Sequence, residues 1–100
     1  MRKEYSSQNF HLSDLPKDGN PLTLFHKWLD EATKQQVIEP NAMSLATVGD
    51  NGRPSNRIVL LKEVREQGFI WFTNTQSRKG HELTKFPFAA LTFWWGPLER

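Results

Sequence analysis

Two short segments carry the residues that could do chemistry in this chain. The first is Arg57-Ile58-Val59-Leu60-Leu61-Lys62, an apolar strand bracketed by cations; the second places Phe72-Thr73 before the cations Arg78-Lys79. Guanidinium, ammonium and hydroxyl groups suit a phosphate, while an apolar strand can support a ring. The pattern therefore predicts a site for a phosphorylated, flat and partly apolar ligand.

The charge distribution agrees with an anionic ligand. Between residues 53 and 79, six basic and two acidic residues give a net charge of +4, against +2 for the whole chain. A local positive excess attracts anions, although a solvated surface is the commoner reason for such a cluster. The four cations of the two segments can equally be surface residues, and Thr73 is an ordinary strand residue. These cations are Arg57, Lys62, Arg78 and Lys79. No reading motif indicates a nucleic-acid partner.

The apolar pattern predicts one helix followed by antiparallel strands. Asn20 and Pro21 are typical of a helix start, and apolar residues then recur at helical spacing through about Gln36. Further along, Ser77 is expected to cap a short helix that reaches about Leu83 and exposes Lys79, His81 and Glu82. Strands are expected over 42–48, 54–64, 69–73 and 87–95, with turns at 49–52 and 66–68. A helix and a meander of strands predict an α+β fold with a small barrel.

Strand geometry sets a condition on the site. Arg57 and Lys62 are separated by an odd number of residues, so strict alternation places them on opposite faces of a strand. Both can reach one ligand only if the strand bulges or the ligand wraps its end, for instance at a subunit interface. Four strands also leave open edges, which pair readily with another chain. We expect that the natural protein continues or that a partner covers these edges.

Composition argues against several other classes. The chain has no cysteine, which excludes a disulfide framework and thiolate metal sites and fits a cytoplasmic protein. No apolar run of about 18 residues predicts a membrane-spanning helix, and the N-terminus lacks the apolar core of a secretion signal. His11, His26 and His81 lack metal-ligand spacing. No nucleophile stands with a base at informative spacing, so no catalytic side chain is predicted.

Several segments, in order along the chain, resemble the pyridoxamine 5'-phosphate oxidase family. They are Arg2-Lys3-Glu4-Tyr5, Pro21-Leu22-Thr23-Leu24-Phe25, Ala42-Met43 with Ala46-Thr47-Val48, Arg57 to Lys62, Phe72-Thr73-Asn74, Ser77-Arg78-Lys79 and Leu98-Glu99-Arg100. The resemblance implies an FMN-binding split β-barrel, antiparallel and preceded by an N-terminal helix. Residues 1–20 would be an extended arm or lid, and residues 21–100 a partial split-barrel domain. The match covers the N-terminal half of a typical member.

The same resemblance implies roles for individual residues. Lys62 would meet both cofactor and substrate, and the family more often has Tyr at the position of Phe72. The FMN contacts would be Arg57, Ile58, Val59, Leu60, Leu61, Lys62, Phe72, Thr73, Arg78 and Lys79. The substrate contacts would be Arg2, Lys3, Glu4, Tyr5 and Lys62.

The implied function is oxidation of pyridoxamine or pyridoxine 5'-phosphate to pyridoxal 5'-phosphate, with FMN as cofactor and O2 as acceptor. The resemblance also implies a homodimer, while composition and charge favour a cytoplasmic protein with no nucleic-acid or membrane partner. We expect the isolated 100-residue chain to bind FMN weakly or not at all and to turn over little substrate. Two alternatives stay open: a split-barrel protein that binds a flavin or other phosphorylated ligand without catalysis, and an interaction domain that pairs through its strand edges.

Overall fold

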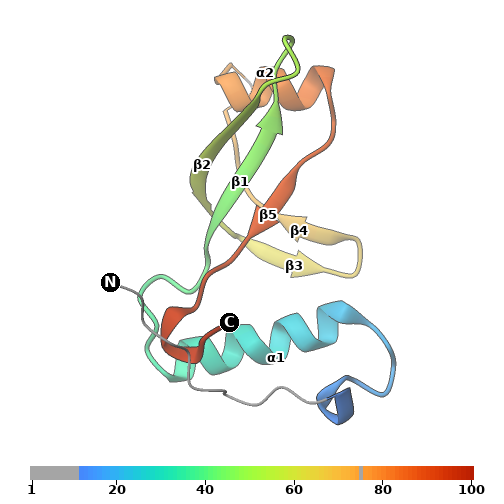
Figure 1. Cartoon of the computed structure of the whole chain (residues 1–100), viewed down its shortest axis with the longest axis vertical. Helices are drawn as coiled ribbons and strands as arrows, with labels where there is room; N and C mark the ends of the chain where they lie inside the picture. The colour runs from blue at the N-terminus through green and yellow to red at the C-terminus, as the bar shows by residue number, and fades with distance from the viewer. Residues whose placement is uncertain (1–11, 75) are drawn as a thin grey trace. The chain divides into compact units, whose positions relative to one another are not determined.

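The structure, a computed structural model, describes residues 12–74 and 76–100 and divides into two compact units (Figure 1). One unit comprises Met1–Pro40 and Trp94–Arg100, and the other comprises Asn41–Phe93. Residues 1–11 of the predicted arm lie outside the described residues, so the arm stays a prediction. The remainder of this segment includes a short 3-10 helix, η1 (Leu12–Asp14). No helix in the described part of the chain is long and apolar enough to cross a membrane.

The first unit is built on helix α1 (Pro21–Lys34). The predicted start is confirmed, because the Asn20 side chain accepts a hydrogen bond from the Leu22 N–H at 2.9 Å and Pro21 occupies the first turn. Trp95 is buried in this unit, and its indole donates to the Pro40 carbonyl at 2.8 Å. The chain then turns through a second 3-10 helix, η2 (Gly96–Leu98).

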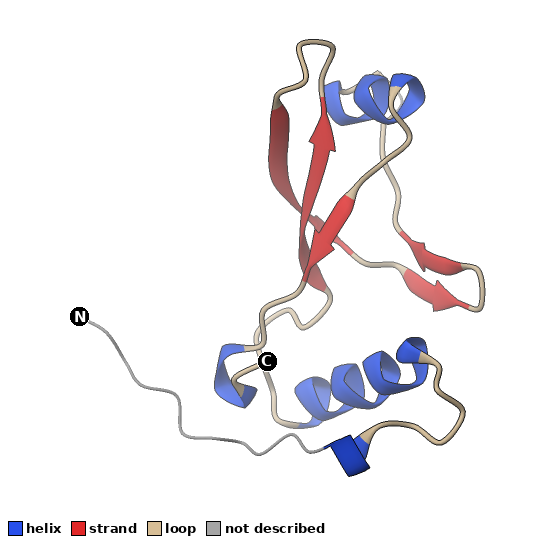
Figure 2. Cartoon of the chain, turned by 45° about the vertical axis from the view of Figure 1, so that its right-hand side comes forward, coloured by secondary structure: helices blue, strands red, loops and turns tan. Residues whose placement is uncertain are grey.

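The second unit holds all the strands. Strand β1 (Ala42–Val48) lies between β2 (Pro54–Leu60) and β5 (Ala90–Thr92), and both neighbours are antiparallel to it. Strands β3 (Glu63–Arg65) and β4 (Gly68–Ile70) form a separate two-stranded sheet (Figure 2). Helix α2 (Arg78–Lys85) packs against β1 and begins at the predicted cap, where the Ser77 hydroxyl accepts from the Gly80 N–H.

The core of the second unit follows the alternation of β1. Met43, Leu45 and Thr47 are almost fully buried, whereas the residues between them are half-buried. The turn after β1 is the predicted one: Gly52 adopts a φ of 76°, and the Asn51 side chain accepts from the Arg53 N–H at 2.9 Å. The hairpin fixes which residues of β2 face the core.

The predicted barrel and three of the predicted strands need correction. Among the described residues the sheets do not close into a barrel, and β5 pairs with β1 rather than following a meander. The predicted strand over 54–64 is broken between Leu60 and Glu63, because the Leu61 N–H bonds to Asn41 while the Lys62 N–H bonds to Ile70. The strand expected over 87–95 is reduced to Ala90–Thr92, and the one over 69–73 to Gly68–Ile70.

Candidate functional site

The apolar part of the predicted site forms a hollow of about 530 Å³ at the end of β2. Its lining includes Asn41 and six of the residues that the sequence singled out: Ile58, Val59, Leu60, Leu61, Lys62 and Phe72. Three of these side chains are unusually open for apolar residues, with Ile58 exposed by 69%, Leu60 by 54% and Phe72 by 77%. Open apolar side chains around a hollow suit the face of a ring.

Asn41 is a lining residue that the sequence did not indicate. Its carbonyl accepts from the Leu61 N–H at 2.8 Å, and its side-chain amide donates to the Leu61 carbonyl at 3.4 Å. These bonds extend the pairing of β1 with β2 one step beyond Ala42 and Leu60. A search for residues opposite the predicted ligand strand could have found it, given the hairpin register.

Arg57 lies on the other face of β2. Residues 55, 57 and 59 are half-buried, while residues 56, 58 and 60 are exposed, as strict alternation predicts. The Arg57 Nη1 donates to the Leu45 carbonyl at 3.0 Å and to the Thr47 hydroxyl at 2.7 Å. Within the described residues, Arg57 is not part of the hollow's lining, whereas Lys62 is exposed at it. The two cations are therefore separated, although Lys62 lies beyond the end of β2 rather than on its opposite face.

A second cluster gathers around Glu82, which α2 carries into the interior. Glu82 accepts from the Thr47 hydroxyl at 2.8 Å, the Arg78 Nε at 2.9 Å and the Ser55 hydroxyl at 3.3 Å. The sequence placed Glu82 on the exposed side of its helix, and this was wrong: its exposed fraction is 6%. The strand hydroxyls of Thr47 and Ser55 compensate for the water that the carboxylate loses.

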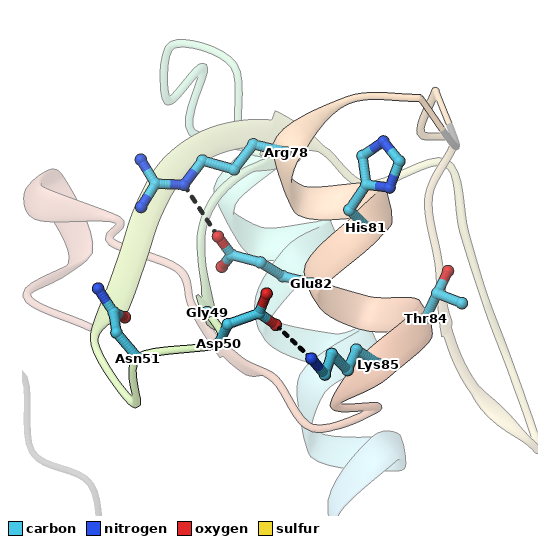
Figure 3. Close-up of a pocket in the computed structure, with 8 residues that line it drawn as sticks. All are labelled: Gly49, Asp50, Asn51, Arg78, His81, Glu82, Thr84 and Lys85. Atoms are coloured by element: carbon cyan, nitrogen blue, oxygen red, sulfur yellow. Dashed lines mark hydrogen bonds and ion pairs between the residues drawn. The ribbon is translucent and has the colours of Figure 1, made fainter.

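The electrostatics of this cluster keep Glu82 ionised. The hydrogen bond from Thr47 lowers the pKa of the Glu82 carboxyl most; burial opposes this, and the bond and charge of Arg78 lower the pKa further. Arg78 and Glu82 also line a hollow of about 620 Å³ beside the hairpin turn, across which Lys85 pairs with Asp50 at 3.1 Å (Figure 3).

The remaining predicted residues are placed as follows. Thr73 is exposed after β4, and Lys79, which the sequence placed on the exposed side of its helix, is half-buried in the first turn of α2. Arg2, Lys3, Glu4 and Tyr5 lie outside the described residues. The structure thus joins the apolar segment and Lys62 in one hollow, and joins Arg57 and Arg78 through Thr47 and Glu82. No group of three or more metal-ligating side chains occurs within residues 12–74 and 76–100.

The second unit is thus an antiparallel α+β unit with an apolar hollow and a cluster of cations, and comparison with known sequences assigns the chain to a family. The profile of the family described as "Pyridoxamine 5'-phosphate oxidase" matches residues 29–100. The chain belongs to the pyridoxamine 5'-phosphate oxidase family.

Curated relatives match along the whole chain. Pyridoxine/pyridoxamine 5'-phosphate oxidases from Nostoc punctiforme, Herminiimonas arsenicoxydans and Neisseria meningitidis serogroup B are 54%, 53% and 50% identical over 100 residues. In each case all of this chain is covered, together with 46%, 46% and 47% of the relative. The chain therefore spans about half the length of these relatives.

Solved structures show the same fold. The crystal structure of PhzG from Burkholderia lata 383, in complex with tetrahydrophenazine-1-carboxylic acid, matches with a TM-score of 0.80 and 34% identity, covering 88% of this chain and 44% of that one. A pyridoxamine 5'-phosphate oxidase-related, FMN binding protein from Nostoc punctiforme matches with a TM-score of 0.62 and 24% identity, over 72% of this chain and 40% of that one. These likenesses support the part of a split-barrel fold that the chain contains.

Proposed function

We propose that the whole protein oxidises pyridoxamine or pyridoxine 5'-phosphate to pyridoxal 5'-phosphate, with FMN as cofactor and O2 as electron acceptor. The observation that carries the proposal is the hollow at the end of β2, where the apolar segment, Phe72 and Lys62 meet. Its chemistry suits a ring with a charged edge, and the chain is about half identical to named oxidases along its whole length.

The residues present fit FMN. The exposed side chains of Ile58, Leu60 and Phe72 would hold the isoalloxazine ring, and the cations Arg57, Arg78 and Lys79 would hold the phosphate. The remaining predicted contacts are Val59, Leu61, Lys62 and Thr73. FMN held by these residues would supply the acceptor for a hydride from the substrate carbon, with O2 as the final acceptor and hydrogen peroxide as the second product.

The chain's own contribution is binding and orientation. Lys62 is exposed at the rim of the hollow, so its ammonium group can contact the cofactor's polar edge or the substrate. Residues 2–5 are proposed to cover the substrate. We further propose a cytoplasmic homodimer in which the second subunit completes the site, since Arg57 lies on the half-buried face of β2, away from the hollow that Lys62 lines beyond the end of that strand.

The proposed function is tested in a hybrid protein in which this chain replaces the matching segment of the Nostoc punctiforme relative. We expect the purified hybrid to bind FMN and to form pyridoxal 5'-phosphate and hydrogen peroxide in equal amounts from pyridoxine 5'-phosphate. Lys79→Ala should weaken FMN binding. The matched control is Lys85→Ala, because Lys85 pairs with Asp50 and is not a predicted cofactor contact.

Two other outcomes favour other functions. A folded hybrid that binds FMN but forms no aldehyde product would favour the non-catalytic flavin-binding protein. Flavin-independent association of the chain, seen by light scattering, would favour an interaction domain, for which the unpaired outer edges of β2 and β5 are the structural basis in the described sheet.

A further inference from the structure

A buried carboxylate connects the cations of the two segments that the sequence singled out. The Glu82 carboxylate accepts hydrogen bonds from the Arg78 Nε and from the Thr47 hydroxyl. The same Thr47 hydroxyl oxygen accepts a hydrogen bond from the Arg57 Nη1. Arg57 comes from β2, Thr47 from β1 and Arg78 from α2. The Glu82 side chain on α2 thus connects to β1 through Thr47 and, through the Thr47 hydroxyl, to Arg57 on β2.

The geometry leaves the terminal nitrogens of the Arg78 guanidinium group available. Glu82 holds Arg78 through Nε alone, and Figure 3 shows the two terminal nitrogens of Arg78 directed away from the carboxylate. The Arg78 side chain is 74% exposed, whereas that of Glu82 is 7% exposed. A guanidinium group fixed by its inner nitrogen presents its outer nitrogens as a fork, which matches two oxygens of a phosphate.

We propose that Glu82 is a positioning residue, which holds the guanidinium groups of Arg78 and Arg57 in the orientation that receives the phosphate of the flavin cofactor. The inference rests on the proposed function, because it assigns the phosphate to these cations. An arginine that is already ordered loses less conformational entropy when it binds a ligand. Glu82 therefore strengthens phosphate binding even though its own charge repels the phosphate.

The effect of removing Glu82 on phosphate binding distinguishes a positioning role from simple charge neutralisation. If Glu82 only neutralised the arginines, its removal would leave a more positive cluster, and phosphate binding would become stronger. If Glu82 positions them, its removal weakens binding. The two explanations predict opposite signs for the same substitution.

The experiment is an NMR titration of the hybrid protein described above, which contains this chain, with FMN and, separately, with riboflavin, which lacks the phosphate. Chemical shifts of backbone amides and of the arginine Nε–H groups report affinity, and exchange of the Arg78 Nε–H with water reports its order. The variants are Glu82→Gln, which keeps an oxygen acceptor for Thr47, and Glu82→Ala. The control is Glu66→Gln, which removes the same charge from an exposed turn residue of the same unit.

We expect Glu82→Gln to bind FMN about tenfold more weakly than the unmodified hybrid, with riboflavin affinity unchanged and faster exchange of the Arg78 Nε–H. Glu82→Ala should lose at least as much, and Glu66→Gln should match the unmodified hybrid or bind FMN slightly better. FMN affinity that is unchanged or higher in a folded Glu82→Gln variant would overturn the inference.

Failure of the proposed function gives a different result. An unmodified hybrid that shows no preference for FMN over riboflavin would place the phosphate elsewhere, and would overturn both the proposed phosphate contacts and the role of Glu82. A preference in the unmodified hybrid that persists in both Glu82 variants would overturn the role of Glu82 alone.

Discussion

At the scale of single residues, Glu82 shows what a sequence pattern leaves out. Arg78 and Glu82 are four residues apart on a short polar helix, which is the usual spacing of an exposed ion pair. Glu82 is buried because Thr47 and Ser55 meet it from strands 35 and 27 residues earlier in the chain. The helical spacing was visible in the sequence, but the strand hydroxyls that make burial possible were not.

The lowered pKa of Glu82 predicts a specific pH dependence of stability. Because the folded-state pKa lies below the ordinary value of 4.5, the ionised carboxylate stabilises the fold above that pH, and this stabilisation is lost as the pH falls through the folded-state pKa. We therefore expect the urea midpoint of the unmodified chain to fall more between neutral pH and about pH 3 than that of Glu82→Gln. Equal falls in the two proteins would show that Glu82 does not carry this stabilisation. The carboxyl groups that both proteins share cancel in the comparison.

At the scale of elements, β1 organises the second unit. It is the central strand of its sheet, α2 packs against it, and its alternate residues are the most buried in the unit. Leu45, fully buried, pairs with Arg57 on one side and with Leu91 on the other. A change at Leu45 therefore disturbs both neighbouring strands.

Leu45→Ala should lower the free energy of unfolding by about 2–5 kcal/mol, because it removes buried methyl groups and leaves a cavity. The measurement is urea denaturation followed by circular dichroism. Leu12→Ala is the matched control, since Leu12 is 82% exposed and its truncation should cost little. A loss below about 1 kcal/mol for Leu45→Ala would mean that the core of this unit is packed less tightly than the structure indicates.

The elements that the sequence predicted well are those specified by local signals. Helix α1 begins at its predicted cap, β1 has its predicted bounds, and Ser77 caps α2. The broken strand after Leu60 was missed because Leu61 and Lys62, although both follow an apolar run, bond to different partners, Asn41 and Ile70. A change of partner depends on tertiary structure, and residue periodicity does not record it.

The candidate site also has a part that the sequence predicts and a part that it does not. The apolar segment and its two faces follow from strand alternation, so the hollow at Ile58, Leu60 and Lys62 could be anticipated. The link between Arg57 and Arg78 could not, because it passes through two side chains on other elements, Thr47 and Glu82. The FMN contacts themselves stay predictions, which the experiments above test.

At the scale of the whole molecule, the chain spans about half the length of its curated relatives. We expect the isolated chain to bind FMN at least tenfold more weakly than the hybrid that restores this length, since fewer groups surround the ligand. Fluorescence-quenching titrations of both proteins measure the difference, and Arg57→Ala should weaken binding in each. Equal affinities would show that the 100-residue chain assembles the cofactor site by itself, and would make its own oxidase activity the next measurement.

The position of β1 between its two neighbours also has a consequence for the order of folding. β1 and β2 are joined by a tight turn and can pair early, whereas pairing of Ser44 with Thr92 must close a long stretch of chain first. The bond from Thr47 to Glu82 spans a similar stretch. Backbone protection in the hairpin should therefore precede the ordering of Arg78, so that a newly made chain passes through a state that already has its first sheet contacts but does not yet hold its arginines in place.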